Sequence, residues 1–580
     1  MTRLHLIRQL LPLLLALIAA ATIAAQAAAS APAPAPASAS VSSRASAAAV
    51  PTLAAARVAA ATATVTTATG AAPAAASKAA PAAAVERWSS TDIVLSGPST
   101  GNPFLEVDLS ATFHNGDSTL KVPGFYDGDG RYIIRFMPDK EGAWTYETHS
   151  NAQSLNAQKG TITATPASKS NHGPVRVKNT WHFAYEDGTP YWQVGTTSYA
   201  WTHQTEELEQ QTLRTLATAP FNKMRMGVFP KRYEYNRAEP RYYPFEGQPP
   251  KTWDFSRFNP QFFRHLEQRV AQLRDLGIEA DIILFHPYDK GAWGFDSMLP
   301  EVNERYLRYV VARLAAYRNV WWSMANEFDF VKSKTMSEWD SYFKIVQATD
   351  PWQHLRSIHN AFVFYNHTQP WVTHVSVQSG AIAEDFERAV LFRDVYNKPV
   401  VYDEVKYEGN FKQRWGQLTP EEMVLRFWEG AIAGTYVGHS ETYQDPNEIA
   451  WWSKGGVLKG QSPQRLAFFR KILSESPSEG LNPIDKWQDY PFAGKHAEYY
   501  LGYFGTEKPE SWPFVLFKTG LKDGMKFRAE VIDTWNMTVT PVDGVFEIGK
   551  RDEYTFVDKN QRSINLPGRP YMALRIIRIP

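Results

Sequence analysis

Two stretches of sequence decide the fold: Trp321-Trp322-Ser323-Met324-Ala325-Asn326-Glu327 and Lys398-Pro399-Val400-Val401-Tyr402-Asp403-Glu404. Each contains a run of apolar and aromatic residues, typical of a buried β-strand, and each ends in a carboxylate. In a barrel of alternating strands and helices, the carboxyl ends of the strands surround one mouth. The two stretches therefore predict that Glu327 and Glu404 belong to a single site.

Residues 175–480 alternate between strand and helix patterns, which predicts a (β/α)8 TIM barrel. Thr419-Pro420-Glu421-Glu422 is a capping box that predicts a helix start just before the eighth strand. The eight expected strands are 191–195, 222–228, 280–285, the strand ending at Glu327, 355–359, 375–378, the strand ending at Glu404, and 434–438.

The segments on either side of the barrel show short alternating strands separated by turn residues. We expect an N-terminal β-sandwich over residues 86–170 and a C-terminal β-sandwich over residues 485–580. Asp127-Gly128-Asp129-Gly130 resembles a calcium loop only in part, because the later ligands are missing. It is better interpreted as a hairpin turn.

The first residues predict export from a bacterial cell. Arg3 and Arg8 precede an apolar stretch, and Ala25-Gln26-Ala27 fits a cleavage site, so residues 1–27 are typical of a signal peptide. An uncleaved membrane anchor is the alternative. Residues 28–85 are mostly Ala, Pro, Ser and Thr and are predicted to be a disordered linker. We therefore expect a secreted or periplasmic protein with no stable membrane insertion after cleavage.

Composition excludes several other classes. The chain has no cysteine, which rules out disulfides, thiolate metal sites and a cysteine nucleophile. Removing Arg3 and Arg8 with the signal peptide leaves 59 basic against 60 acidic residues, a balance that argues against a nucleic-acid partner. No pattern for a zinc site or a phosphate-binding loop is present, so neither a metal nor a cofactor is expected.

Several motifs in the central segment resemble the bacterial apiosidase-like family of glycoside hydrolases. They are NKMRMGVFPK (222–231), LFHPYDKGAWGF (284–295), MANEFDF (324–330), HSETY (439–443) and WWSKGG (451–456), in the order sandwich, barrel, sandwich. The resemblance covers the chain from about residue 87 to its end. It implies a clan A catalytic barrel in which Glu327 is the general acid/base and Glu404 the nucleophile.

The acid–base chemistry of glycoside hydrolysis requires the same two roles. A general acid needs a raised pKa to hold its proton near neutrality, whereas the nucleophile must stay ionised. Arg225, at the end of the second strand, is placed to keep Glu404 charged. Asn326 is expected to hydrogen-bond a sugar hydroxyl, and His286, at the end of the third strand, to orient a carboxylate.

Two carboxylates compete with Glu404. Asp403 is its neighbour, but strand alternation should send the two to opposite faces. Because Val400 and Tyr402 share the face of Glu404 and suit an inner layer, we favour Glu404. Glu441 lies past the eighth strand, so a pairing of Glu441 with Glu327 remains open.

Further residues in the predicted loops are candidates for substrate binding. Aromatic side chains stack on sugar rings, and polar groups near the eighth strand complete the set: Trp201, Tyr288, Trp293, Tyr443, Trp452, His439 and Glu441. Asp329 and Glu408 are expected to be solvated loop residues or secondary sugar contacts. Clan A enzymes often end the sixth strand with Tyr and the eighth with Trp, whereas this chain has Gln378 and His439 there.

The sequence thus predicts an exported glycosidase that cleaves oligo- or polysaccharides with retention. In that mechanism the two carboxyl groups lie about 5–6 Å apart. The alternative is a non-catalytic carbohydrate-binding or surface-adhesion protein that uses the barrel as a scaffold.

Overall fold

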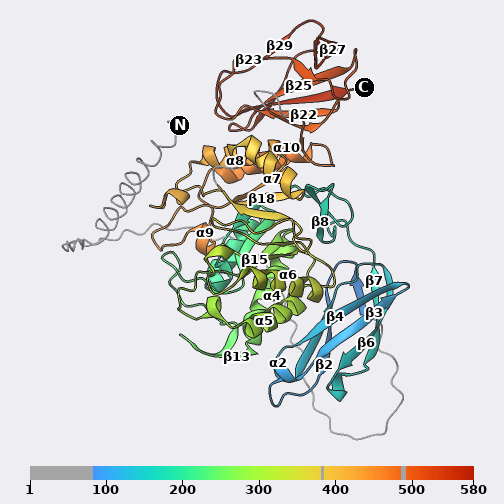
Figure 1. Ribbon diagram of the computed structural model, residues 1–580, viewed down its shortest axis with the longest axis vertical. Helices are drawn as coiled ribbons and strands as arrows, with labels where there is room; N and C mark the ends of the chain where they lie inside the picture. The colour runs from blue at the N-terminus through green and yellow to red at the C-terminus, as the bar shows by residue number, and fades with distance from the viewer. Residues whose placement is uncertain (1–82, 380–383, 485–490) are drawn as a thin grey trace, which may run out of the picture. The chain divides into compact units, whose positions relative to one another are not determined.

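The computed structural model describes residues 83–379, 384–484 and 491–580 (Figure 1). The expected signal peptide and almost all of the expected linker lie outside the described residues. Strand β1 begins at Ala83, inside the segment that composition assigns to the linker. In the described part of the chain, no helix has both the length and the hydrophobicity that crossing a membrane requires.

The central region contains eight parallel strands in the order β16-β15-β14-β11-β10-β19-β18-β17. An isolated parallel bridge between His359 and Ser376 links the two edge strands, so the sheet is a near-closed barrel. The strands are β10 (Gly195–Thr197), β11 (Lys223–Gly227), β14 (Glu279–Phe285), β15 (Val320–Ala325), β16 (Arg356–Ser357), β17 (Val375–Gln378), β18 (Val400–Glu404) and β19 (Tyr436–His439).

Helices follow most of these strands. They are α3 (Glu206–Leu216), α4 (Pro260–Asp275), α5 (Pro300–Leu314), α6 (Met336–Thr349), α7 (Phe386–Tyr396), α8 (Pro420–Ile432), the short α9 (Trp451–Lys454) and α10 (Ser462–Ser474). Helix α8 begins with the predicted capping box at Thr419. The described chain has no helix between β16 and β17, so the expected strand–helix alternation is interrupted there.

Two hairpins in this region were not expected. In one, β12 (Phe245–Gln248) pairs with β13 (Thr252–Phe258) ahead of α4. In the other, β8 (Val175–Lys178) pairs with β9 (His182–Tyr185). Phe183 of β9 packs against Trp321 and Tyr436, with ring centroids 5.1 Å away in both cases. Because Trp321 is the second residue of β15 and Tyr436 the first of β19, this hairpin covers the amino-terminal mouth of the barrel.

The first barrel strand begins later in the sequence than expected. Residues 191–195 were predicted to form it, but β10 starts only at Gly195. Tyr191 instead joins the buried cluster beneath the barrel, together with Phe183, Leu355 and Val401. Sequence pattern alone did not separate this apolar approach segment from the strand that follows it.

The N-terminal region is a seven-stranded arrangement in the order β1-β7-β6-β3-β4-β5-β2. Strand β4 pairs with β3 up to Pro123 and with β5 from Gly124 onward, so it changes partner at a Pro-Gly step. The strands are β1 (Ala83–Glu86), β2 (Thr91–Ser96), β3 (Leu109–Asn115), β4 (Ser118–Tyr126), β5 (Arg131–Phe136), β6 (Gly142–Ser150) and β7 (Lys159–Thr165), with helix α2 (Pro103–Glu106) between β2 and β3. The expected hairpin turn at 127–130 joins β4 to β5 and is confirmed.

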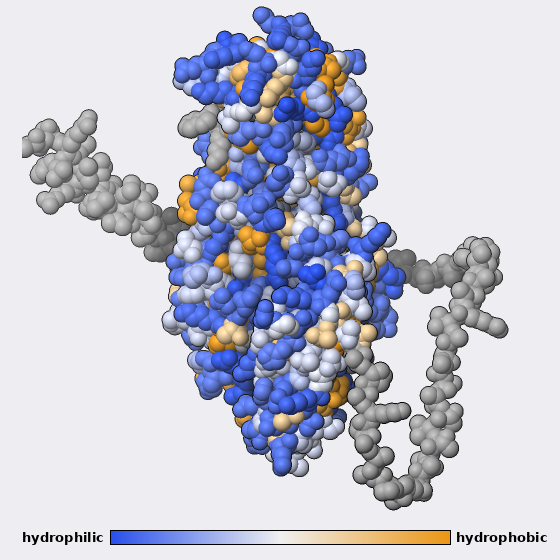
Figure 2. Space-filling view, turned by 90° about the vertical axis from the view of Figure 1, so that its right-hand side faces the viewer, coloured by the Kyte–Doolittle hydropathy of each residue, from blue (hydrophilic) through white to orange (hydrophobic). Residues whose placement is uncertain are grey.

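The C-terminal region is also rich in sheet. Its strands are β20 (Asn482–Pro483), β21 (Phe492–Lys495), β22 (Tyr499–Tyr503), β23 (Ser511–Pro513), β24 (Val515–Phe517), β25 (Lys526–Asp533), β26 (Thr538–Pro541), β27 (Phe546–Lys550), β28 (Thr555–Asp558), β29 (Ser563–Asn565) and β30 (Met572–Ile579). A separate apolar cluster that includes Tyr500, Phe514, Phe527 and Leu574 forms its core. On the face shown in Figure 2, hydrophobic residues occur only in small, separate patches.

Both flanking regions contact the barrel through buried groups. Arg313 of α5 is fully buried and pairs with Asp127 of the N-terminal region at 2.9 Å and with Glu267 of α4 at 2.6 Å. On the C-terminal side, Trp428 of α8 stacks on Tyr503 of β22 with a centroid separation of 5.5 Å. The barrel core is therefore continuous with apolar residues of both regions.

Candidate active site

A cleft of about 540 Å³ opens at the carboxyl ends of the barrel strands. It holds both predicted carboxylates, Glu327 directly beyond β15 and Glu404 at the end of β18. The other residues that line it are Tyr199, Lys231, Tyr233, Glu234, Tyr235, Tyr288, Lys290, Asn326, Phe362, Gln378, Lys406, Tyr407, Gln413, Arg414, Trp415 and Trp452. The cleft thus unites residues from the ends of at least six strands.

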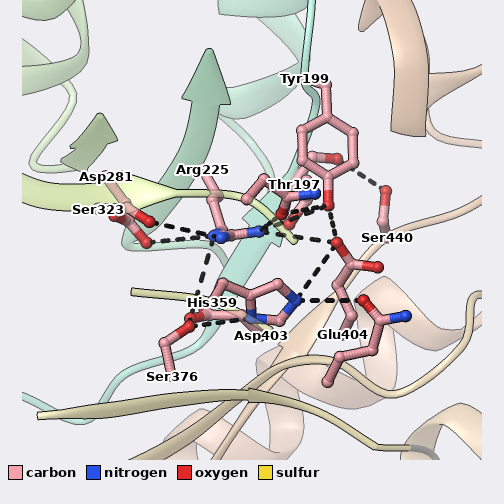
Figure 3. A network of polar contacts seen from close by, with 12 residues as sticks. Thr197, Tyr199, Arg225, Asp281, Ser323, His359, Ser376, Asp403, Glu404 and Ser440 are labelled. Atoms are coloured by element: carbon pink, nitrogen blue, oxygen red, sulfur yellow. Dashed lines mark hydrogen bonds and ion pairs between the residues drawn. The ribbon is translucent and has the colours of Figure 1, made fainter. Parts of the chain in front are cut away.

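Glu404 is surrounded by groups that favour its ionised form (Figure 3). The Tyr199 hydroxyl donates a hydrogen bond to Oε1, His359 Nε2 lies 3.5 Å from Oε1, and Arg225 Nη1 lies 3.7 Å from it. Burial alone raises the pKa of Glu404. The hydrogen bond and charge of His359, the Arg225 guanidinium and the Tyr199 hydroxyl outweigh burial and hold that pKa well below its usual range.

Glu327 has the opposite environment. Its Oε2 atom is buried and has no hydrogen-bond partner among the described residues. Burial, and then the charge of Glu404, raise the pKa of Glu327 to about 8, while Lys231 and Gln378 act in the lowering direction. Its backbone is left-handed, with φ 46° and ψ 54°, a conformation that costs energy for a residue with a Cβ and is concentrated at functional sites. Near neutral pH, Glu327 is therefore the carboxyl that carries a proton.

A layer of buried charges lies beneath the cleft. Lys223 Nζ pairs with Asp281 Oδ2 at 3.0 Å and with Asp403 Oδ1 at 2.8 Å. Arg225 Nε lies 3.7 Å from Asp281 Oδ2. Two cations thus face two carboxylates, and their pairing lowers the free-energy cost of burying each charge.

The layer reaches the nucleophile position through His359. Asp403 Oδ2 accepts a hydrogen bond of 2.5 Å from Ser376 Oγ, and Ser376 Oγ lies 3.1 Å from His359 Nδ1 (Figure 3). Nε2 of the same imidazole is 3.3 Å from Gln378 Oε1. His359 therefore connects the buried layer with both Glu404 and the cleft residue Gln378.

The alternation argument that separated Asp403 from Glu404 needs correction. Val401 packs in the buried cluster at the amino-terminal mouth of the barrel, and Asp403 pairs with Lys223, so Val401 and Asp403 face the interior. Val400 and Tyr402 therefore do not belong to an inner layer. Glu404 nevertheless reaches the cleft, because the register between β17 and β18 shifts at Val377/Gln378 and pairs Gln378 with Glu404.

Asn326 and Arg225 lie at the predicted strand ends, and they hydrogen-bond to each other, which was not expected. Asn326 lines the cleft, and its Oδ1 accepts a hydrogen bond from Arg225 Nη1 at 2.5 Å. The Tyr199 hydroxyl oxygen, whose hydrogen is donated to Glu404, lies 3.3 Å from the same Oδ1. Arg225 is buried below the cleft and acts on the substrate side only through these neighbours. With its oxygen engaged in this way, Asn326 presents its amide NH₂ group as a donor.

Among the expected aromatic residues, Tyr288 and Trp452 line the cleft, whereas Trp201 and Trp293 do not. Trp201 is fully buried, and its Nε1 points to Met226 Sδ at 3.3 Å. Trp293 is 1% exposed, and its Nε1 donates to Glu239 at 3.1 Å. Both rings belong to the packing of the loops, because apolar contacts cover their faces.

His286 and His439 also lie outside the cleft lining. His286 is buried, with Nε2 3.1 Å from the Phe229 carbonyl oxygen and Nδ1 accepting the Tyr288 N–H. It therefore holds the loop that carries Tyr288 and touches neither carboxylate of the cleft. His439 stacks on Phe221, and its Nδ1 lies 3.1 Å from Thr196 Oγ1.

The alternative pairing of Glu441 with Glu327 is not supported, because Glu327 lines the cleft and Glu441 does not. Glu441 is 1% exposed and accepts backbone N–H groups of Lys459 and Gly460. It lies beside Glu408, which is fully buried and accepts hydrogen bonds from Tyr443 and from the Gln461 N–H. These carboxylates hold the start of α10, so Glu408 is not the solvated residue that we expected, and Glu441 and Tyr443 lie outside the cleft lining.

Asp329 has a structural contact as well. It is half-buried and accepts the backbone N–H groups of Ala361, Phe362 and Val363 at 2.6, 2.8 and 2.9 Å. The loop after β16 is thereby fixed. This loop places Phe362, whose side chain is 78% exposed, at the cleft.

Within the described part of the chain, two carboxylate clusters contain a histidine within ligand distance, Glu408–His439–Glu441 and Glu206–Glu209–His265. In the first, backbone N–H groups already occupy the carboxylate oxygens. In the second, Arg269 Nε pairs with Glu209 at 2.6 Å and supplies the positive charge. Neither donor set favours a metal ion, so we assign none.

Sequence reasoning did not find several residues of the site: Tyr199, Lys231, Tyr233, Tyr235, His359, Tyr407 and Trp415. Most of them follow a strand directly or after a few residues, as Tyr199 follows β10 and Lys231 follows β11. His359 was included as the last residue of the fifth strand without a function. A survey of every polar residue just beyond a strand end could have found them.

Comparison with known families identifies the family of this chain. A family model described as "Apiosidase-like, catalytic domain" matches residues 177–489. The chain belongs to the apiosidase-like family. Two further models, both described as domains of unknown function, match residues 84–151 and 487–577, which correspond to the two flanking regions. The resemblance found in the sequence motifs is thereby confirmed.

Solved structures agree with this assignment. A crystal structure described as a "putative glycoside hydrolase" from Bacteroides vulgatus ATCC 8482 is 44% identical, with a TM-score of 0.83, and the match covers 86% of this chain and all of that one. A glycoside hydrolase family 5 structure from the same organism matches 70% of this chain and 93% of its own at 14% identity, with a TM-score of 0.53, a likeness of fold alone. A search of curated proteins gave no match. Family and fold are therefore those of glycoside hydrolases, whose substrates are carbohydrates.

Proposed function

We propose that this apiosidase-like protein hydrolyses glycosidic bonds of oligo- or polysaccharides by a retaining double displacement, with Glu404 as nucleophile and Glu327 as general acid/base. The observation that carries the proposal is the opposite shift of two pKa values within one cleft, raised for Glu327 and lowered for Glu404. Two carboxyls with separated pKa values are what an acid and a nucleophile require.

In the first step, a Glu404 oxygen attacks the anomeric carbon while Glu327 gives its proton to the departing glycosidic oxygen. The contacts of Tyr199, His359 and Arg225 all go to Oε1, so we assign the attack to Oε2. A covalent glycosyl ester forms, and the leaving sugar departs as an alcohol. The glycosidic bond is the only bond that breaks on the sugar.

In the second step, the ionised Glu327 takes a proton from a water molecule that attacks the same anomeric carbon. The ester bond to Glu404 breaks, the carboxylate is restored, and Glu327 is again protonated. Asn326 can donate its amide hydrogens to a sugar hydroxyl during both steps, because Arg225 holds its oxygen. Two inversions give net retention.

The surroundings of the cleft support an extended glycan as substrate. Tyr235 and Trp415 are half-buried, lie along it and offer ring surface of the kind on which sugars stack. The exposed Phe362 adds a ring at the rim. We also propose, from the N-terminal sequence, that the protein is exported and acts outside the cytoplasm.

The experiment that tests the function is a screen of plant and microbial polysaccharides with the full-length protein, followed by NMR of the first product anomer. Release of a sugar with the configuration of the substrate supports the proposal. An inverted product contradicts the double displacement. Binding of a glycan with no turnover by the unmodified protein would instead favour the non-catalytic binding protein.

Replacement of the two carboxylates separates their roles. Glu404→Ala should lose activity by at least about 10³-fold, because the covalent step is removed. Azide should then give a glycosyl azide of inverted configuration. Glu327→Ala with a dinitrophenyl glycoside should retain the first step, and azide should give the retained glycosyl azide. The reverse pattern would exchange the roles of Glu327 and Glu404.

A further inference from the structure

A buried lysine lies in the cleft inside a cage of aromatic rings. Lys231 is 3% exposed, and its Nζ lies 3.7 Å from the ring centroid of Tyr199 and 3.9 Å from that of Tyr288. The rings of Tyr233 and Trp452 are 4.6 and 5.1 Å away. Cation–π attraction to these faces fixes the ammonium group in position but gives its N–H bonds no acceptor.

The ammonium group of Lys231 is not committed to a protein carboxylate. Lys223, the other buried lysine of the site, makes two ion pairs with Asp281 and Asp403. Lys231 makes no ion pair of this kind within the described residues, although the charges of Glu327 and Glu404 act on it from a longer distance. A buried cation without an acceptor is costly, so its polar face needs a partner from the cleft.

Apart from the two catalytic carboxylates, most charged residues of the cleft lining are basic, like Lys231. Beside the two catalytic carboxylates, the cleft lining holds four basic residues, Lys231, Lys290, Lys406 and Arg414, and one acidic residue, Glu234. Glu327 must be protonated for the first step, which leaves four basic residues against Glu404 and Glu234. The buried layer below does not alter this balance, because Lys223 and Arg225 face Asp281 and Asp403.

We propose that the cleft selects a glycan that carries an anionic group, a carboxylate or a sulfate, on a sugar bound next to Glu327 and Glu404, and that Lys231 is the residue that pairs with this group. The proposal rests on the proposed glycosidase function and specifies its substrate. Lys290, Lys406 and Arg414 are exposed on the cleft wall and supply a longer-range attraction for further acidic sugars of the chain.

The charge state of Lys231 agrees with this role. Burial lowers the pKa of Lys231 to about 7, against the effect of the two carboxylates. An anionic group in contact with Nζ adds to the effect of the carboxylates and favours the ammonium form. A neutral sugar offers no such compensation, so the cage distinguishes the two kinds of substrate by electrostatics as well as by shape.

The test uses the full-length Glu404→Gln protein, in which binding is measured without turnover. Affinity electrophoresis is run with carboxylated polymers (polygalacturonate, glucuronoxylan, alginate) and with sulfated carrageenan. Each carboxylated polymer is compared with its carboxyl-reduced form, and carrageenan with its desulfated form. We expect at least one anionic polymer to retard the protein with a dissociation constant at least tenfold lower than that of its neutral counterpart. Whether the carboxylated polymers or the sulfated carrageenan show this difference identifies the recognised group as a carboxylate or a sulfate.

Lys231→Met in the same background keeps the length and the apolar stem of the side chain and removes the charge. It should raise the dissociation constant for the anionic polymer at least tenfold and leave that for the neutral counterpart unchanged. Lys344→Met is the matched control, because Lys344 also lies over an aromatic ring, 4.6 Å from the centroid of Trp371, but is exposed outside the cleft lining. This control should bind like the parent.

Three outcomes overturn the proposal: no anionic polymer is bound, the neutral counterpart binds equally well, or Lys231→Met binds like Lys344→Met. The proposed glycosidase function is judged separately with the unmodified protein. Hydrolysis of a neutral glycan by the unmodified protein, together with any of these three outcomes, would leave the glycosidase function standing and remove this proposal. Binding of an anionic glycan that the unmodified protein never cleaves would contradict the glycosidase function and leave the recognition of the anionic group by Lys231 standing.

Discussion

His359 Nε2 lies 3.5 Å from Oε1 of Glu404, while its Nδ1 faces Ser376 in the buried layer below the cleft. The hydrogen bond and charge of His359 are the largest of the effects that lower the pKa of Glu404. His359 does not need to touch the substrate to do this. It is a positioning residue that sets the charge and orientation of the proposed nucleophile.

His359→Gln should therefore move the acidic limb of the activity profile. Without the imidazole, the pKa of Glu404 rises, and kcat/KM should begin to fall at a pH higher by about one unit or more. The measurement is kcat/KM against pH for an aryl glycoside that the unmodified protein cleaves. Lower activity with an unchanged acidic limb would mean that His359 acts only through packing.

The basic limb should report Glu327. Its pKa is raised to about 8, so the protonated acid is present below that value and is lost as the pH rises through it. We expect kcat/KM for an alkyl glycoside to fall above about pH 8. A dinitrophenyl glycoside needs no acid in the first step, so its kcat/KM should lack this limb. Equal basic limbs for both leaving groups would contradict the assignment of the acid.

Lys223→Met tests the buried layer. The substitution leaves Arg225 as the basic residue that pairs with Asp281 and Asp403 in the described part of the chain. Removing one partner of a buried charge network typically costs about 3–5 kcal/mol of unfolding free energy. Urea unfolding followed by tryptophan fluorescence measures this loss. The exposed Lys344→Met is the control and should change the midpoint little.

The loss from Lys223→Met should also depend on pH. Pairing with Lys223 and Arg225 lowers the pKa of Asp403, so the stability contributed by this carboxylate is present above the unfolded value of about 3.9 and is lost as the pH falls below it. The variant and the unmodified protein should thus differ most near neutrality and converge in acid. A difference that stays constant between pH 7 and pH 3 would contradict ionic pairing.

Phe362→Ala tests the rim of the cleft. The ring is 78% exposed, yet Asp329 fixes its loop, so an ordered apolar face is presented to solvent beside the catalytic residues. We expect KM for long oligosaccharides to rise about 5- to 100-fold, with little change for an aryl monosaccharide. Leu391→Ala, another exposed apolar residue that lies outside the cleft lining, is the control. Equal effects on short and long substrates would contradict a platform role.

The sequence predicted most of the barrel because its strands are unusually clear. The run around Trp321 and Trp322 is apolar on both faces, as a strand buried between a barrel interior and its helices must be. Glu327 and Glu404 were recognised for the same reason, since a carboxylate after such a run interrupts the pattern. The hairpin of β8 and β9 was missed because its packing partners lie far away in sequence.

Side-chain direction at the strand ends was not predictable. Alternation assigned Glu404 to the face of Tyr402, but a shift of register between β17 and β18 turns Glu404 into the cleft. Likewise, Trp201 and Trp293 resemble sugar platforms by residue type and loop position. Only the surrounding atoms show that they are buried. Lys231 ends the motif NKMRMGVFPK but could not be given a role from the sequence, because the four rings that hold it come from separate loops.

A fragment of residues 175–480 should be poorly soluble, whereas removal of residues 28–82 should leave activity and stability unchanged. The fragment loses Asp127, so the fully buried Arg313 keeps its contact with Glu267 but loses one of its two paired carboxylates. It also exposes Trp428, which stacks on Tyr503, and Trp352, whose Nε1 donates to the Met137 carbonyl at 2.8 Å.

An uncovered apolar surface of this kind favours aggregation. Size-exclusion chromatography and an activity assay measure both changes. A soluble, monomeric and fully active fragment would mean that the flanking regions are independent modules, whose role would then be sought in binding the polymer.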